Sequence, residues 1–269
     1  PPELYAKTRS VMERMEEARE ASYAAAKTVT PDPAALEAWR QSTAAFLTAN
    51  PTGWLPLQAT AITRGGSLPP PSQASDQSIL LTGEPVKNDT LTITYTLPPN
   101  TSLKTIRLEA LPDAANKNRV GRSPDGKFTL TPKFAVNRQV LGLSYQQADR
   151  RTPEKYSNGS QSPLLENTWQ SAPAVFEEPS NAASLPHHAH YHLDASRTFT
   201  KAATLTLTLK SADIGKFRVS ISPFADPIPG EPSALHPQLA SAFKSGKTTN
   251  PDIAAAFVLA TTPFEKLPV

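Results

Sequence analysis

The sequence predicts a mainly β fold: a β-sandwich with an α-helical hairpin before it and a short helical tail after it. Several segments alternate apolar and polar residues with the period of two that is typical of half-buried strands. The alternation is clearest in residues 90–97 and 203–210, where apolar side chains take turns with threonine. The chain also holds 28 prolines in 269 residues, twice the usual share of ~5%. Because proline breaks helices and central strands, we expect short strands joined by long loops.

The first 50 residues predict two helices that pack as an antiparallel hairpin. Residues 3–27 carry a thin apolar stripe with alternating spacings of four and three. A second helix is expected over residues 34–49, because Asp32 is a good N-cap and Pro33 fits the first helical position. We expect this hairpin, residues 1–50, either to brace the β domain or to dock on another subunit.

The sandwich domain is expected to span residues 51–224. Its predicted strands cover residues 54–62, 78–82, 90–97, 104–110, 127–136, 174–177, 188–194, 203–210 and 216–222. Two polar stretches, residues 112–126 and 139–168, are predicted as long loops across the sandwich.

Residues 225–269 are rich in proline and are expected to form a third part of the chain, a tail with short helices. A short helix is expected around residues 237–244. A last helix is expected over residues 253–260, with Asn250 as its cap.

Composition excludes several classes of protein. The net charge is only +3 and the basic residues are scattered, so no nucleic-acid surface is predicted. The absence of cysteine excludes disulfides, zinc-thiolate sites and covalent haem attachment within this chain. The sequence contains no run of ~18 apolar residues, so no membrane-spanning helix is predicted. The sequence begins with Pro1 and Pro2, without Met or a signal peptide, so we expect a processed product or a fragment of a longer polypeptide.

A series of short motifs gives the chain a family resemblance. They are Trp39 with its helix, WLPL at residues 54–57, IRLEALPD at 106–113, GR at 121–122, GKFTL at 126–130, WQSAP at 169–173 and IGKFRVSIS at 214–222. In this order they resemble the middle section of the large extracytoplasmic proteins of planctomycetes and related bacteria that begin with a cytochrome-c-like domain. The chain departs from that pattern at Arg119 and Val120, where the family has glycine and proline, and in its cluster of histidines, where the family has a single histidine.

The resemblance implies a jelly-roll module similar to discoidin-like and other carbohydrate-binding sandwiches. It implies a non-catalytic binding or scaffolding role in an exported protein, in the periplasm or on the cell surface. The implied partners are other domains or subunits of a cytochrome-containing protein, with haem held there and not in this chain. A glycan is the implied ligand.

A histidine-rich strand suggests a metal site. His188, His190 and His192 alternate, so their side chains share one face, and residues two apart on a strand are ~7 Å apart, within reach of one zinc ion. The alternative is a polar strand face, exposed or hydrogen-bonded. In the long loop, Asp125 is a candidate calcium ligand together with backbone carbonyls, and Arg122 is a candidate ion-pair partner that holds the loop.

Sugar binding requires an exposed aromatic ring with amides or charges beside it. The candidates are Trp169 with Asn167 and Gln170, Tyr145 in the polar excursion, and Arg122. The alternative for Trp169 is a core or loop-anchoring role. Trp39 and Trp54 lie on apolar faces and are expected in the core. Arg107 and Glu109 alternate with apolar residues and are expected to pair at the surface, contributing little.

No catalytic motif is present, so we expect the chain not to be an enzyme. There is no GxSxG nucleophile elbow and no glycine-rich phosphate loop. Glu177 and Glu178 are adjacent, so in a strand they face opposite ways and cannot act as a glycosidase pair. Two alternatives to a binding module stay open: a structural subunit that docks in a larger haem-protein assembly without a small ligand, and a metal-binding protein that uses the histidine strand.

Overall fold

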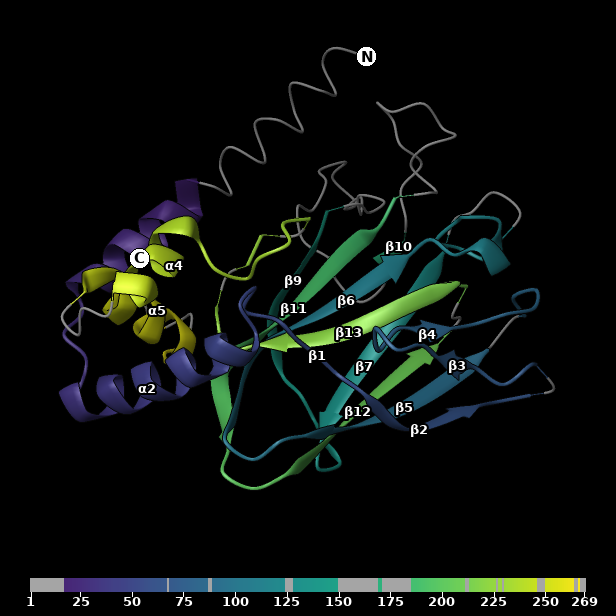
Figure 1. Cartoon of the computed structure of the whole chain (residues 1–269), viewed down its shortest axis with the longest axis horizontal. Helices are drawn as coiled ribbons and strands as arrows, with labels where there is room; N and C mark the ends of the chain where they lie inside the picture. The colour runs from purple at the N-terminus through teal and green to yellow at the C-terminus, as the bar shows by residue number, and fades with distance from the viewer. Residues whose placement is uncertain are drawn as a thin grey trace, which may run out of the picture.

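The computed structural model describes residues 17–66, 68–86, 89–123, 128–149, 169–170, 185–210, 213–225, 227–228, 230–245, 250–263 and 266. These residues form a jelly-roll-like β-sandwich with a group of helices beside it (Figure 1). The predicted fold class is therefore confirmed.

One sheet of the sandwich has seven described strands, all paired antiparallel. Their order is β3-β4-β13-β6-β11-β9, and β1 also pairs with β13. The bounds are β1 Leu55–Pro56, β3 Ser72–Gln73, β4 Ile79–Leu80, β6 Thr101–Leu111, β9 Leu143–Ala148, β11 His187–Phe199 and β13 Lys216–Ser222.

The other sheet has six described strands in the order β10-β7-β12-β5-β2, with β8 on β7. The bounds are β2 Ala59–Arg64, β5 Thr90–Leu97, β7 Thr129–Val136, β8 Gln139–Val140, β10 Trp169–Gln170 and β12 Ala203–Lys210. The chain crosses between the sheets from β5 to β6 to β7, and again from β11 to β12 to β13. This wrapping of antiparallel strands is the jelly-roll arrangement.

The core lies between the two sheets and is built from the alternating apolar residues. It includes Leu91, Ile93, Tyr95, Leu97, Ile106, Leu108, Ala110, Ala189, Tyr191, Leu205, Leu207, Leu209, Phe217, Val219 and Ile221. On the other face of the six-stranded sheet, Thr94 pairs with Thr206 and Thr96 with Thr204, and these threonines are partly or fully exposed. The seven-stranded sheet differs, because residues 103–110 of β6 are buried on both faces.

The helices lie beside the sandwich, where α5 Pro251–Thr261 contacts β11 (Figure 1). Residues 17–28 are helical, and they are followed by α2 Pro33–Ala49, α4 Pro237–Ser245 and α5. The α5 helix packs against α2 on one face through Ile253 and Ala256, and against the first helix on another through Ala255. The α2, α4 and α5 helices therefore form one cluster around Trp39, and the first helix packs on α5 (Figure 1).

The two predicted N-caps, Asp32 and Asn250, are confirmed. Asp32 Oδ1 accepts a hydrogen bond from the Ala35 amide at 2.8 Å, with Pro33 in the first turn of α2. Asn250 Oδ1 accepts from the Asp252 amide at 2.8 Å at the start of α5. Within the described residues, no helix has the length and apolar content needed to cross a membrane.

Two predictions about the strands are wrong. The segment 54–62, predicted as one strand, contains β1 and the start of β2, which lie in different sheets. The polar excursion was expected to begin at residue 139, but residues 139–148 contain β8 and β9. The β9 strand is polar because it lies at an edge of the seven-stranded sheet, where its buried Gln147 bonds to other polar groups. The predicted strand 174–177 and the first helical turns, residues 3–16, lie outside the described residues.

Candidate functional site

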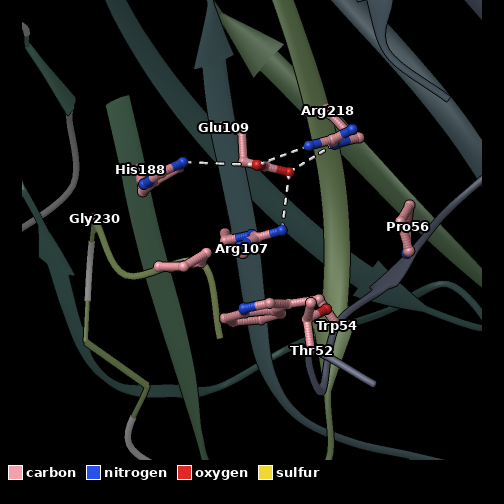
Figure 2. A pocket seen from close by; sticks show the side chains of 9 residues that line it. Thr52, Trp54, Pro56, Arg107, Glu109, His188, Arg218 and Gly230 are labelled. Atoms are coloured by element: carbon pink, nitrogen blue, oxygen red, sulfur yellow. Dashed lines mark hydrogen bonds and ion pairs between the residues drawn. The ribbon is translucent and has the colours of Figure 1, made fainter. Parts of the chain in front are cut away.

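A pocket of about 310 Å³ lies on the second face of the seven-stranded sheet (Figure 2). It is lined by Thr52, Trp54, Pro56, Arg107, Glu109, His188, Arg218, Gly230 and Pro232. Three strands of the sheet form its floor, the link from α2 to β1 forms one wall, and the start of the tail contributes Gly230 and Pro232.

Strand register brings the charged residues together. Glu109 on β6 is paired in register with His188 on β11 and with Arg218 on β13. These three side chains form a row across the sheet, and Arg107 lies two residues before Glu109 on the same face. Residues that are far apart in the sequence therefore meet at one carboxylate.

Glu109 is the centre of a buried ion-pair network. Arg218 donates from Nε to Glu109 Oε2 at 2.7 Å and from Nη2 to Oε1 at 3.0 Å. Arg107 Nη2 lies 3.2 Å from Oε2, and His188 Nε2 lies 3.6 Å from Oε1. Burial by itself raises the pKa of the Glu109 carboxyl, but His188, Arg218 and the charge of Arg107 lower it to about 2. The carboxylate is therefore ionised at neutral pH.

The guanidinium of Arg107 packs against the aromatic ring of Trp54. Its Cζ lies 4.3 Å from the ring centroid of Trp54, a cation–π contact. Burial lowers the pKa of the Arg107 guanidinium to about 10, against the opposing effect of Glu109. Trp54 in turn lies 5.2 Å, between ring centroids, from His190. The Trp54 ring therefore positions Arg107, and its covered face is not free for stacking on a ligand.

Several buried nitrogen atoms at the pocket have no hydrogen-bond partner among the residues that the structure describes. They are Trp54 Nε1, Arg107 Nε and His188 Nδ1. Buried polar atoms are usually paired, so unpaired nitrogens on three residues that line one pocket mark a place where a ligand can bind.

Arg107 and Glu109 are expected to pair across strands at the surface. The pairing of Glu109 across strands is confirmed by Arg218, but the predicted surface location is wrong. The exposed fractions of Arg107 and Glu109 are only 6% and 3%. The alternation correctly placed them on the non-core face of β6. Trp54 and the tail cover that face, which the pattern of β6 alone does not reveal.

The prediction that the alternating histidines share one face of β11 is confirmed, and the structure shows what they contact there. His190 and His192 are fully buried, with 6.1 Å between ring centroids. His190 Nδ1 lies 3.0 Å from the Pro227 carbonyl, and His192 lies between Thr105 and Gln147, 3.1 Å from each. These histidines anchor the tail to the sheet.

The structure gives no support to a metal site on this strand. Among the described residues, no group of three or more His, Asp or Glu side chains could hold one metal ion. Of the three predicted ligands, only His188 lines the pocket. Asp125 lies outside the described residues.

The predicted sugar-binding residues do not meet at this pocket. Tyr145 stacks on His192, with ring centroids 4.1 Å apart. Arg122 is buried and donates from Nη2 to Asp89 Oδ2 at 2.9 Å, so it holds the interior rather than a ligand. Trp169 and Gln170 form β10, which pairs with β7 in the other sheet.

Asn167 lies outside the described residues. Sequence reasoning missed the pocket, although it noted Arg107 and Glu109 on one face of their strand. One sequence signal could have indicated the pocket: Arg218 and His188 also lie on the faces of their strands that point away from the core.

Comparison with known proteins finds similarity to solved structures only. No protein-family model matches the chain, and no curated protein matches it. Among solved structures it is similar to the catalytic domain of a GH87 alpha-1,3-glucanase in complex with nigerose, at 10% identity and a TM-score of 0.29, over 66% of this chain and 29% of that one. It is also similar to a carbohydrate-binding module studied for specific mannan recognition, at 10% identity and a TM-score of 0.27, over 67% of this chain and 90% of that one.

A third likeness is to the enzymatically active domain of tailspike protein 4 of bacteriophage CBA120, at 12% identity and a TM-score of 0.19, over 63% of this chain and 19% of that one. The chain thus spans less than a third of the glucanase and the tailspike chains. At these TM-scores, the likenesses assign neither a ligand nor a reaction to this chain.

Proposed function

We propose that this chain is a non-catalytic carbohydrate-binding module and that the pocket around Glu109 is its saccharide site. The observation that carries the proposal is the fixed set of charged groups around Glu109, beside unpaired nitrogens, in a pocket of about 310 Å³. That volume is at the lower end of the ~300–1,000 Å³ found for small-ligand pockets. Guanidinium, imidazole and hydroxyl groups supply the hydrogen bonds that sugar hydroxyls require, and Pro56 and Pro232 supply apolar walls.

The chemistry of the pocket favours binding over hydrolysis. A glycosidase needs two carboxyl groups, one of them a general acid with a raised pKa. Among the described residues that line the pocket, Glu109 is the sole carboxylate, and the ion pairs lower its pKa to about 2. It is therefore a fixed acceptor and orients Arg107 and Arg218.

The test is polysaccharide binding by the purified chain, measured by affinity electrophoresis with wild type and Arg218→Gln. Arg218 is the more exposed of the two pocket arginines, and Arg107 still pairs with Glu109 when Arg218 is replaced, so loss of Arg218 should remove retention and disturb the fold less than loss of Arg107. Arg197→Gln is the matched control, since Arg197 is exposed on β11 and the charge change is identical. Failure of the wild type to bind any polysaccharide, or equal retention of Arg218→Gln, would contradict the proposal.

A proposal about the larger protein to which this chain belongs rests on the family resemblance alone. We propose that the module belongs to an exported cytochrome-containing protein and contacts its other domains or subunits. Native material should then elute with haem absorbance in a defined ratio to this chain. A monomer without haem would contradict this setting and leave the saccharide site untouched.

A further inference from the structure

The charges in the pocket do not balance within its buried part. Glu109 carries one negative charge, whereas Arg107 and Arg218 carry one positive charge each, with side chains 7% and 24% exposed. Asp76 lies on the outer side of Arg218, with Oδ2 3.9 Å from Nη1, but its side chain is 48% exposed and therefore well screened. Within the described part of the chain, the Arg107 charge has only a share of the Glu109 carboxylate to offset its burial.

A second nearby carboxylate is already engaged. Asp149 accepts a hydrogen bond from the His188 amide at 2.9 Å and lies 3.8 Å from His187 Nδ1. Asp149 therefore holds the start of β11. Burying a charge without a full partner is costly, so the pocket is suited to a ligand that brings a negative charge.

The unpaired nitrogens also indicate a ligand with hydrogen-bond acceptors, and this argument does not depend on the charge balance. Trp54 Nε1 and Arg107 Nε can only donate hydrogen bonds, and both side chains are more than nine-tenths buried. A ligand that satisfies them must present acceptors, and a carboxylate has two oxygens that accept from a guanidinium in a planar, paired arrangement. Arg218 adds a partly exposed guanidinium at the mouth (Figure 2).

We infer that the pocket binds the carboxylate of an acidic saccharide, a uronate unit, through Arg107, Arg218 and the Trp54 indole N–H. This inference rests on the proposed carbohydrate-binding function and names its ligand class. The pocket of about 310 Å³ takes the charged end of the saccharide, and the remaining sugar units lie outside it.

The test is calorimetric titration of the whole chain with trimers of galacturonate, glucuronate and mannuronate. The methyl esters of the same trimers remove the charge and keep the sugar ring, and sulfated trimers keep a charge and lose the carboxylate. At least one uronate trimer should bind about tenfold or more tightly than its ester, since a charged hydrogen bond is lost. The affinity should fall as salt is added.

Two variants locate the effect. Arg218→Gln should abolish the preference for acid over ester, and Trp54→Phe, which keeps an aromatic ring under Arg107 but lacks the N–H, should weaken uronate binding several-fold. Arg197→Gln should bind like the wild type. Trp54→Phe keeps the test informative if Arg218→Gln does not fold.

The outcomes separate the two proposals. Equal affinity for uronates and their esters would overturn the acidic ligand and leave the saccharide site standing. Absence of binding to any acidic or neutral saccharide would overturn both. Equal binding of sulfated trimers that survives Arg218→Gln would show general charge attraction and overturn the assignment to this pocket.

Discussion

The guanidinium of Arg107 lies over the ring of Trp54, with its Cζ 4.3 Å from the ring centroid. Trp54 belongs to the link between α2 and β1, whereas Arg107 lies in the middle of the seven-stranded sheet. The contact therefore ties the helical cluster to the polar face of the sandwich at the pocket. The stability of the pocket and the attachment of the helices should change together.

Loss of the Glu109 charge should strongly destabilise the fold. Glu109→Gln keeps the shape of the side chain but leaves Arg107 and Arg218 without a shared counter-charge on a face where Glu109 is 3% exposed. Removing one member of a buried ion pair costs about 3–5 kcal/mol, and urea unfolding at neutral pH measures it. Glu231→Gln, an exposed change in the tail, should cost less than about 0.5 kcal/mol. A loss below about 1 kcal/mol for Glu109→Gln would contradict the network described.

A second buried carboxylate should behave in the same way. Asp89 accepts from Arg64 Nη2 at 2.7 Å and from Arg122 Nη2 at 2.9 Å, and all three side chains are nearly fully buried. Asp89→Asn should therefore cost about 3–5 kcal/mol in urea unfolding. Because the Arg122 amide also bonds to the Asp213 carbonyl at 2.7 Å, its hydrogen exchange should accelerate. Glu84→Gln, an exposed change, is the control, and unchanged exchange at Arg122 in Asp89→Asn would show that the ion pairs do not hold this loop.

The sequence predicted local structure well, because local structure depends on neighbouring residues. The bounds of β5, β12 and β13 coincide with the predicted strands, and both predicted N-caps are made. Alternation and capping act over a few residues, so one sequence is enough to show them.

The pocket could not be predicted, because it depends on register and coverage. Glu109, His188 and Arg218 meet only through the pairing of β6 with β11 and β13. Whether that face is covered depends on the end of the sandwich and the start of the tail, where the Phe224 and Pro227 carbonyls bond to Thr105 and His190 of the sheet. Neither contact leaves a local pattern in the sequence.

A methyl group at Gly53 should disturb the wall of the pocket. Gly53 has φ +75, and an added Cβ would clash with Leu235 Cδ1. Gly53→Ala should therefore cost about 1–2 kcal/mol in backbone strain alone, and more once Leu235 has to move. Thermal unfolding measures the loss, and tryptophan fluorescence reports displacement of the adjacent Trp54. Gly142→Ala is the matched control, since nothing lies within 4 Å of a Cβ there, and an equal effect at both glycines would exclude a steric cause.

Mild acid should loosen the contact between the tail and the sheet through the buried histidines. Burial lowers the pKa of His192 from 6.5 to about 3, and it lowers the pKa of His190 well below 6.5. The unfolded chain therefore binds protons that the folded chain refuses as the pH falls below about 6.5, so stability is full above that pH and declines below it. Each histidine contributes a slope of about 1.4 kcal/mol per pH unit until its folded pKa is reached. The paired carboxylates, such as Glu109 with its pKa lowered to about 2, add to the loss only below about pH 4.5.

Urea unfolding between about pH 7 and pH 5 isolates the histidine effect, because the carboxylates do not titrate in that range. His192→Gln should reduce the slope by about 1.4 kcal/mol per pH unit, whatever its effect on absolute stability at neutral pH. His236→Gln removes an exposed histidine of the tail and should leave the slope unchanged. The buried imidazole is responsible only if the wild type and His192→Gln diverge as the pH falls; parallel curves would assign the acid sensitivity to another group.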